Sequence, residues 1–195
     1  MEREDPGAKN YPGLIDEAVD KVRSGDREAF RTIIHVFERQ IYTYCYYILK
    51  SREEAEDAVQ DVFVKVYKEL GRYEKKVSFS AWLYKVAYHH CLDQIRKRKR
   101  RIRLLSLYKQ QQPKAYLDPG LENPVESLFM DQLTPEESNL LILKVVEQYS
   151  FEEMGQIMEC KPSSLRKKYE RLRKKLVQQR NNEGGRSHET MAESN

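Results

Sequence analysis

The chain has 195 residues, and its 35 Lys and Arg against 31 Asp and Glu give a formal net charge of +4. Charged residues make up 34% of the sequence and hydrophobic residues 39%, a balance typical of a soluble, helix-rich protein. We expect no insertion into a membrane, because no stretch approaches the roughly 20 apolar residues that span a bilayer. Residues 1–13 lack the apolar run of a signal peptide, so they are expected to form a flexible N-terminus.

The charges are distributed unevenly along the chain. Acids outnumber bases over residues 51–61, nearly every residue from 96 to 103 is basic, and Glu170 is the one acid among many Lys and Arg from 161 to 180. This segregation predicts one acidic partner surface and two basic surfaces that bind phosphate. The three cysteines are far apart, which argues against a disulfide framework and favours a reducing, cytoplasmic location.

Helical periodicity dominates the first hundred residues. Residues 14–23 predict a short helix, and Asp26 is expected to cap a helix that runs to Ile48. The sequence Ser51-Arg52-Glu53-Glu54 has the form of a capping box, so the next helix is expected to begin there and to end near Gly71.

A further helix is expected from about Ser80 to Arg101. The segment that follows is polar, contains three prolines and has no apolar period. This composition predicts a flexible linker over residues 102–130.

Two more capping boxes, at Thr134–Glu137 and Ser150–Glu153, predict the starts of the C-terminal helices. A break at Cys160–Ser163 precedes a basic helix that is expected to run to about Gln179, and residues 181–195 are expected to be disordered. The sequence therefore predicts an all-α protein with two small helical domains, residues 14–101 and 131–180, the second a helix-turn-helix.

The helix after Ser51 has two distinct faces. Its apolar stripe consists of Ala55, Ala58, Val59, Val62, Phe63, Val66, Tyr67 and Leu70, and the opposite side carries Asp57, Gln60, Asp61, Val64 and Lys68. Such a polar side is either an ordinary solvated face or a partner surface. The apolar Val64 among the polar residues favours a partner surface.

The helix from Ser80 also has two sides. Leu83, Tyr84, Ala87, Cys91 and Ile95 fall on one side, and Trp82, Lys85, Val86, His89, Asp93, Arg96 and Arg100 fall on the other. An outward Trp beside Lys, His and Arg suits base stacking with phosphate contacts. The alternative is that Trp82 packs beneath the preceding loop.

Consecutive His89, His90 and Cys91 do not predict a metal site, because neighbours on a helix point about 100° apart and cannot converge on one ion. The sequence also lacks a nucleophile elbow, a phosphate-binding glycine loop, a paired-carboxylate motif and an HExxH motif. We therefore expect neither an enzyme nor a bound cofactor.

The most specific pattern is the C-terminal one, in which two helices are joined by a tight break and the second is strongly basic. Leu165, Tyr169, Leu172 and Leu176 form its expected buried stripe, which leaves Arg166, Lys167, Glu170, Arg171 and Lys174 facing outward. The alternative is an ordinary charged surface helix, which the excess positive charge argues against.

Three segments together resemble bacterial sigma factors of the extracytoplasmic-function (ECF) group, the small two-domain members of the sigma-70 family. They are AEDAVQDVFVKVY (Ala55–Tyr67), FSAWLYKVAYHHCLDQIRKRKR (Phe79–Arg100) and SFEEMGQIMECKPSSLRKKYERLRKKL (Ser150–Leu176). The resemblance covers roughly residues 22–177 without the linker. It implies a specificity subunit that binds core RNA polymerase and promoter DNA, with an anti-sigma factor as an expected further partner.

The resemblance assigns roles to individual residues. It implies that Asp57, Gln60, Asp61 and Val64 contact the polymerase clamp. It implies that the loop of residues 73–78 and the following helix recognise and melt the −10 promoter element, through Lys75, Lys76, Trp82, Lys85, His89 and Arg96. The helix from Ser163 would read the −35 element, through Ser164, Arg166, Lys167, Glu170, Arg171 and Lys174.

The chain departs from the family at two places. His89 stands where members commonly have Asn, so the −10 preference is open. Ser163-Ser164-Leu165 stands where the recognition helix usually begins with a Gly-Thr-Val type sequence. Glu170 either accepts from a cytosine N4 or pairs with Arg166 or Lys174 within its helix. The rival reading of the whole chain is a free-standing helix-turn-helix transcriptional regulator.

Overall fold

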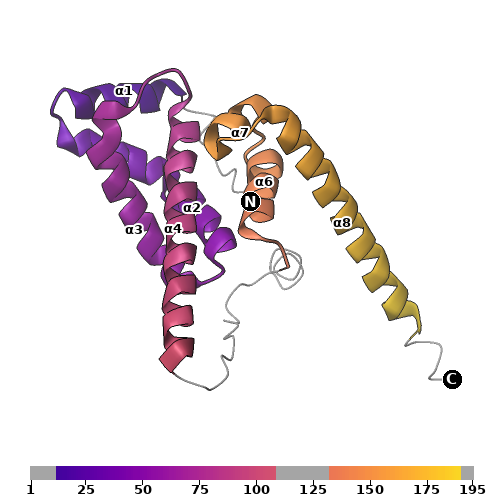
Figure 1. Ribbon diagram of the computed structural model, residues 1–195. Helices are drawn as coiled ribbons and strands as arrows, with labels where there is room; N and C mark the ends of the chain where they lie inside the picture. The colour runs from indigo at the N-terminus through magenta and orange to yellow at the C-terminus, as the bar shows by residue number, and fades with distance from the viewer. Residues whose placement is uncertain (1–11, 109–131, 190–195) are drawn as a thin grey trace.

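The computed structural model describes residues 12–108 and 132–189, and every element within these ranges is helical (Figure 1). An N-terminal bundle contains α1 (Pro12–Arg23), η2 (Arg27–Ala29), α2 (Phe30–Leu49), α3 (Arg52–Glu69), η3 (Leu70–Arg72) and α4 (Phe79–Tyr108). A C-terminal bundle contains α6 (Pro135–Leu141), η4 (Ile142–Val146), α7 (Phe151–Met158) and α8 (Pro162–Glu189), and α8 projects away from the other helices. The all-α prediction is confirmed.

Side-chain caps explain where the C-terminal helices begin. Thr134 Oγ1 accepts a hydrogen bond from the Glu137 N–H, and the Glu137 carboxylate accepts one from the Thr134 N–H. Ser150 and Glu153 form the same reciprocal pair at the start of α7. Both boxes satisfy N–H groups that a helix start leaves without partners.

The expected box at Ser51 is only half formed. Ser51 accepts from the Glu54 N–H at 3.2 Å, but the Glu54 carboxylate instead accepts from Arg98 Nη1 on α4 at 3.0 Å. A charged partner from a neighbouring helix has therefore taken the place of the Ser51 backbone N–H.

The apolar stripes predicted from the sequence form the core of the N-terminal bundle. Ile33, Phe37 and Ile41 of α2 are buried against the α3 stripe and against α4. Tyr67 was expected in that stripe but is 37% exposed. Val86 was expected on the outward side of α4 but is buried, because α4 packs against α2, α3 and α7 rather than along one face only.

Two helices end later than expected. α4 continues to Tyr108 rather than Arg101, so the first residues of the predicted linker are helical. α8 continues to Glu189 rather than Gln179, so residues 181–189 are helical instead of disordered. Extending an existing helix costs far less than starting one, and no proline interrupts either extension. Residues 109–131, 190–195 and 1–11, which include most of the predicted linker, lie outside the described residues.

The two bundles pack against each other. α4 contacts α7 and α2 contacts α6. Tyr44 on α2 donates a buried hydrogen bond to Asn139 Oδ1 on α6 at 2.6 Å, and Tyr149 donates to Ser80 Oγ on α4 at 2.8 Å. Burial raises the pKa of both Tyr44 and Tyr149, so both phenols keep the proton that they donate. This contact joins residues up to 95 positions apart.

Within the described ranges, we find no helix that combines the length and the apolar character needed to cross a lipid bilayer.

Candidate functional site

The turn between α7 and α8 is unusually tight. Glu159 ends α7 in the left-handed region at φ 53°, and the Cys160 N–H returns to the Gly155 carbonyl at 3.1 Å. A Cβ at Gly155 would lie 2.8 Å from the Cys160 carbonyl oxygen, closer than two such atoms can approach. Gly155 therefore allows the turn to fold back onto α7, which sets the direction of α8.

The outward side of α8 carries the basic residues that the sequence predicted there. Leu165 and Leu172 are buried and Tyr169 and Leu176 are partly buried, while Ser164, Arg166, Lys167, Glu170, Arg171 and Lys174 are all exposed. Arg166 Nη2 pairs with Glu152 Oε1 at 2.8 Å and its guanidinium lies over the Phe151 ring.

Glu170 pairs with neither Arg166 nor Lys174 among the ion pairs within residues 132–179, so its carboxylate is available to an external donor. The alternative of an intrahelical pair is not realised in this conformation. Lys167, Arg171 and Lys174 also lack an ion pair there, which leaves a positive surface open to phosphate.

Trp82 combines both of the alternatives that the sequence left open. Its ring is half-buried, with its centroid 5.3 Å from that of Tyr73 and 5.7 Å from that of Phe79. Trp82 thus packs against the loop before α4 while part of the ring stays accessible. Lys75 and Lys76 of that loop are exposed and pair with Asp20 and Glu74 at 2.8 and 2.6 Å.

Lys85 and His89 face a carboxylate of the C-terminal bundle. Lys85 Nζ lies 2.8 Å from Glu159 Oε1, and His89 Nε2 lies 3.8 Å from Glu159 Oε2. The hydrogen bond and charge of Lys85, followed by the charge of His89, lower the pKa of Glu159. His89 Nδ1 also lies 2.9 Å from the Lys85 carbonyl oxygen. Arg96, farther along α4, is exposed and pairs with Asp93 at 2.9 Å.

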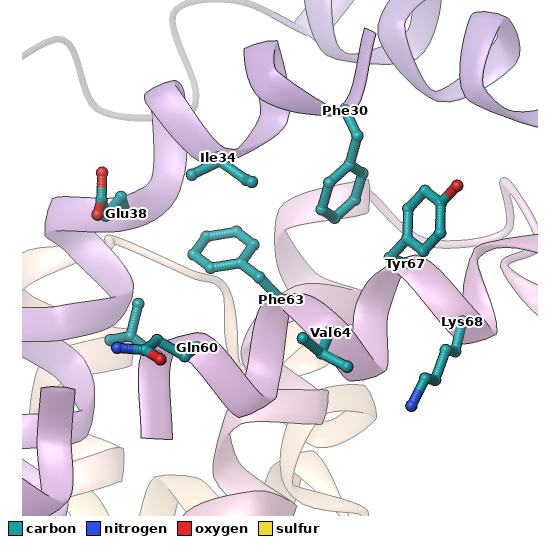
Figure 2. Close-up of a pocket in the computed structure, with 9 residues that line it drawn as sticks. Phe30, Ile34, Glu38, Gln60, Phe63, Val64, Tyr67 and Lys68 are labelled. Atoms are coloured by element: carbon teal, nitrogen blue, oxygen red, sulfur yellow. The ribbon is translucent and has the colours of Figure 1, made fainter. Parts of the chain in front are cut away.

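The side of α3 with Asp57, Gln60, Asp61 and Val64 is exposed along its whole length. Beside it lies a groove of about 390 Å³ between α2 and α3, lined by Phe30, Ile34, Glu38, Val59, Gln60, Phe63, Val64, Tyr67 and Lys68 (Figure 2). Figure 2 shows apolar side chains of both helices at its centre, with Glu38 and Lys68 near its ends. Val64 is 51% exposed, so this groove presents apolar surface to solvent.

Sequence reasoning found the outward faces but missed three residues that shape them. Gly155 sets the α7–α8 turn, Glu159 holds Lys85 and His89, and Arg23 binds the turn after α3. Glu159 and Arg23 act on partners 74 and 47 residues away, so no local pattern signals them. Gly155 had a signal, since a glycine inside a short predicted helix often marks close backbone approach.

Two family models match the chain, one in each bundle. The family model described as Sigma-70 region 2 matches residues 33–101, and that described as Sigma-70, region 4 matches residues 128–176. The ECF RNA polymerase sigma factor SigW of Bacillus subtilis is 26% identical over 181 residues, 85% of this chain and 96% of that protein. The RNA polymerase sigma-H factor of Pseudomonas aeruginosa is 24% identical over 174 residues, 82% and 90% of the two chains.

Two solved structures share the fold at 18% sequence identity. One is the sigma factor RpoE in complex with the anti-sigma factor NepR from Bartonella quintana, with a TM-score of 0.64 over 76% of this chain and 94% of that one. The other is CnrH in complex with the cytosolic domain of CnrY, with a TM-score of 0.62 over 87% and 96%.

Proposed function

The chain belongs to the ECF group of the sigma-70 family and is a sigma factor, and we propose how its surfaces divide the work of promoter-specific initiation. The α3 face binds core RNA polymerase, the α4 face and the loop of residues 73–78 bind the −10 element, and α8 binds the −35 element. In this proposal the chain has no catalytic residue, acts in the cytoplasm, and leaves RNA synthesis to the polymerase.

The polymerase surface is supported by the groove between α2 and α3. The groove has a hydrophobic lining that includes Phe63, Val64 and Tyr67. The adjoining exposed face of α3 carries Asp57 and Asp61. Interfaces combine such an apolar centre with a polar rim. An apolar helix or loop of the polymerase, with basic residues beside it, fits this surface.

The strongest support for the proposal comes from the exposed side of α8, which is assigned to the −35 element. α8 follows a tight turn and is anchored by Leu165 and Leu172. Among its described side chains it exposes a row of cations together with the carboxylate of Glu170, which has no ion pair within residues 132–179. Arginine suits the major-groove edge of guanine and glutamate suits the N4 donor of cytosine, so Arg171 and Glu170 are assigned to base reading. Lys167 and Lys174 are assigned to phosphates.

The −10 surface requires a change in the chain before DNA can bind. Lys85 and His89 are engaged by Glu159, and a promoter strand that uses the same side chains must displace that carboxylate. We therefore propose that α7 leaves α4 when the polymerase complex engages its promoter. An anti-sigma factor, as found with the structural neighbour RpoE, is a proposed further partner.

The test is transcription by purified core polymerase with this protein on a library of genomic fragments, with transcript starts mapped. Starts that share upstream sequences and depend on the protein are expected. The absence of any specific start would refute the proposal and favour an independent helix-turn-helix regulator, which binds duplex DNA tightly without polymerase.

A variant pair localises the polymerase surface. Asp57→Ala with Asp61→Ala is expected to weaken core binding about tenfold or more, because both charges lie on the proposed interface. Asp16→Ala with Glu17→Ala removes the same charge from exposed positions on α1 and is expected to leave core binding unchanged. Equal losses for both pairs, measured by titration of labelled core enzyme, would contradict the assignment.

A further inference from the structure

Arg23, the last residue of α1, reaches across to the turn that follows α3. Its Nε donates to the Leu70 carbonyl at 3.2 Å, and its Nη2 donates to the carbonyls of Gly71, at 3.3 Å, and of Tyr73. These carbonyls lie at the end of a helix, where the backbone lacks intrahelical donors. One guanidinium thus caps three carbonyls at the point where the chain leaves α3.

Tyr73 connects the Arg23 contacts to the loop of residues 73–78. Its ring is 2% exposed and lies 5.9 Å from the Arg23 guanidinium. Its hydroxyl donates to the Val77 carbonyl at 2.8 Å, so the loop closes around one buried side chain. The other neighbours of the ring are Phe79, edge-on at 5.5 Å, and Trp82 at 5.3 Å.

A second contact ties α1 to the same loop. Lys75 Nζ lies 2.8 Å from Asp20 Oδ2. Both side chains are about half exposed, so this pair stabilises little by itself. The Arg23 contacts are partly buried and multiple, and they set the shape of the loop.

We propose that Arg23 is a positioning residue for promoter opening, acting through Tyr73 on the loop and on Trp82. The inference rests on the proposed function of this loop in binding the −10 element. Arg23 itself touches no DNA; it holds the loop and the Trp82 ring in the arrangement that receives an unstacked base. α1 lies outside residues 33–101 matched by the region 2 family model, and Arg23 ties it to that unit.

Lysine cannot replace Arg23 in this role. Its single ammonium lacks the planar fork that bonds several carbonyls at once. Without the guanidinium, the Leu70 carbonyl still accepts a hydrogen bond from the Tyr73 N–H at 3.2 Å. The Gly71 carbonyl is exposed, so water can bond to it instead. The bundle is therefore expected to stay folded in Arg23→Ala and Arg23→Lys, while the loop and Trp82 lose their fixed arrangement.

The first measurement uses the free protein. Trp82 is the only tryptophan of the chain, so its fluorescence reports on this loop alone. Both Arg23 variants are expected to shift Trp82 emission to longer wavelength and to increase its quenching by acrylamide. Lys21→Ala is the matched control, since it removes one cation from the same helix, where Lys21 forms an exposed pair with Glu17. Unchanged Trp82 emission in Arg23→Ala would overturn the proposal.

The second measurement uses the complex with core polymerase on a promoter found with the wild-type protein. Open complexes, detected by permanganate reactivity of unpaired thymines, are expected to fall about tenfold in both Arg23 variants, the effect of losing a charge-assisted contact. Core binding should stay within about twofold of wild type. Wild-type levels of open complex in the Arg23 variants would contradict the positioning role. So would a loss of core binding as large as the loss of open complex. If wild type opens no promoter, the proposed function itself fails, whatever the fluorescence.

Discussion

His89, His90 and Cys91 are consecutive in α4 but lie in three different environments. The His89 ring lies between the Lys85 carbonyl and Glu159, and the His90 ring lies 3.7 Å from Asp61 on α3. Cys91 is fully buried, and its hydrogen bond with Cys45 together with burial holds the pKa of its thiol well above the usual range. The cysteine is thus an unreactive core residue.

His90 is expected to make stability depend on pH. Burial lowers the pKa of His90 from 6.5, outweighing the attraction of Asp61, and Lys65 and Lys97 lower it further. Because the folded state binds this proton less readily than the unfolded state, the stabilisation exists above pH 6.5 and is lost as pH falls through the lower folded pKa. In His90→Gln the fall in thermal midpoint from pH 7 to pH 5 should be smaller than in the wild-type protein, because the partly buried imidazole is no longer there to take up a proton.

The control for this measurement is His35→Gln, which changes an exposed histidine on α2. It should keep the pH dependence of the wild-type protein. Thermal unfolding followed by circular dichroism at pH 7, 6 and 5 gives both results. A pH dependence in His90→Gln that matches wild type would assign the effect to other groups.

At the scale of elements, the capping residues and apolar stripes predicted where helices begin and which sides they bury. Thr134 and Ser150 act at the expected positions because capping is a local interaction between residues three apart. The ends of α4 and α8 were missed, since continuing a helix needs no marked signal. The outward faces of α3 and α8 followed from the same periodicity, so those candidate residues were accessible to sequence reasoning.

Gly155→Ala is expected to disturb the α7–α8 turn. Alanine adds about 1 kcal/mol of helix preference, but its Cβ would lie 2.8 Å from a backbone oxygen, and such overpacking costs about 1–3 kcal/mol. The steric cost should prevail, because backbone cannot move aside as a flexible side chain can. We expect lower stability in urea unfolding and weaker binding of −35 duplex by the polymerase complex.

Gly13→Ala provides the comparison, because a Cβ at this α1 position meets nothing within 4 Å. It should be neutral or slightly stabilising. If Gly155→Ala matched it in both measurements, the close approach of Cys160 would not be what sets the direction of α8.

Across the whole molecule, the contact between the bundles covers part of the surface assigned to promoter DNA. Rings of Tyr44, Tyr84 and Tyr149 follow one another across the boundary, with centroids 5.0 and 5.9 Å apart. The Tyr44–Asn139 bond is buried beside them, and Glu159 holds Lys85 at the rim. Sequence patterns could not predict this packing, because partners so far apart in the chain leave no shared period.

Glu159→Gln is expected to free Lys85 and His89 for DNA. Since the pair with Lys85 is exposed and worth at most about 1 kcal/mol, the affinity of the free protein for a short single-stranded oligonucleotide should rise by at most about fivefold. Fluorescence polarisation at fixed salt measures this. Glu152→Gln makes the same charge change but releases Arg166 on α8 instead. An equal rise in both variants would attribute the effect to net charge alone.

Glu159 also means that the folded chain supplies its own counter-ion to the surface proposed to bind the −10 element. Dissolved salt weakens contacts between Lys85 and a phosphate, but it equally weakens the exposed contact between Lys85 and Glu159, whose side chains are 39% and 60% accessible. Screening of the phosphate contact disfavours DNA binding by Lys85, whereas screening of the Glu159 contact favours it, so the two effects of salt partly cancel. Fewer dissolved counter-ions are exchanged when DNA replaces a carboxylate than when it meets a hydrated ammonium. If this surface binds DNA as proposed, its affinity is therefore expected to fall less steeply with ionic strength than its number of cations implies.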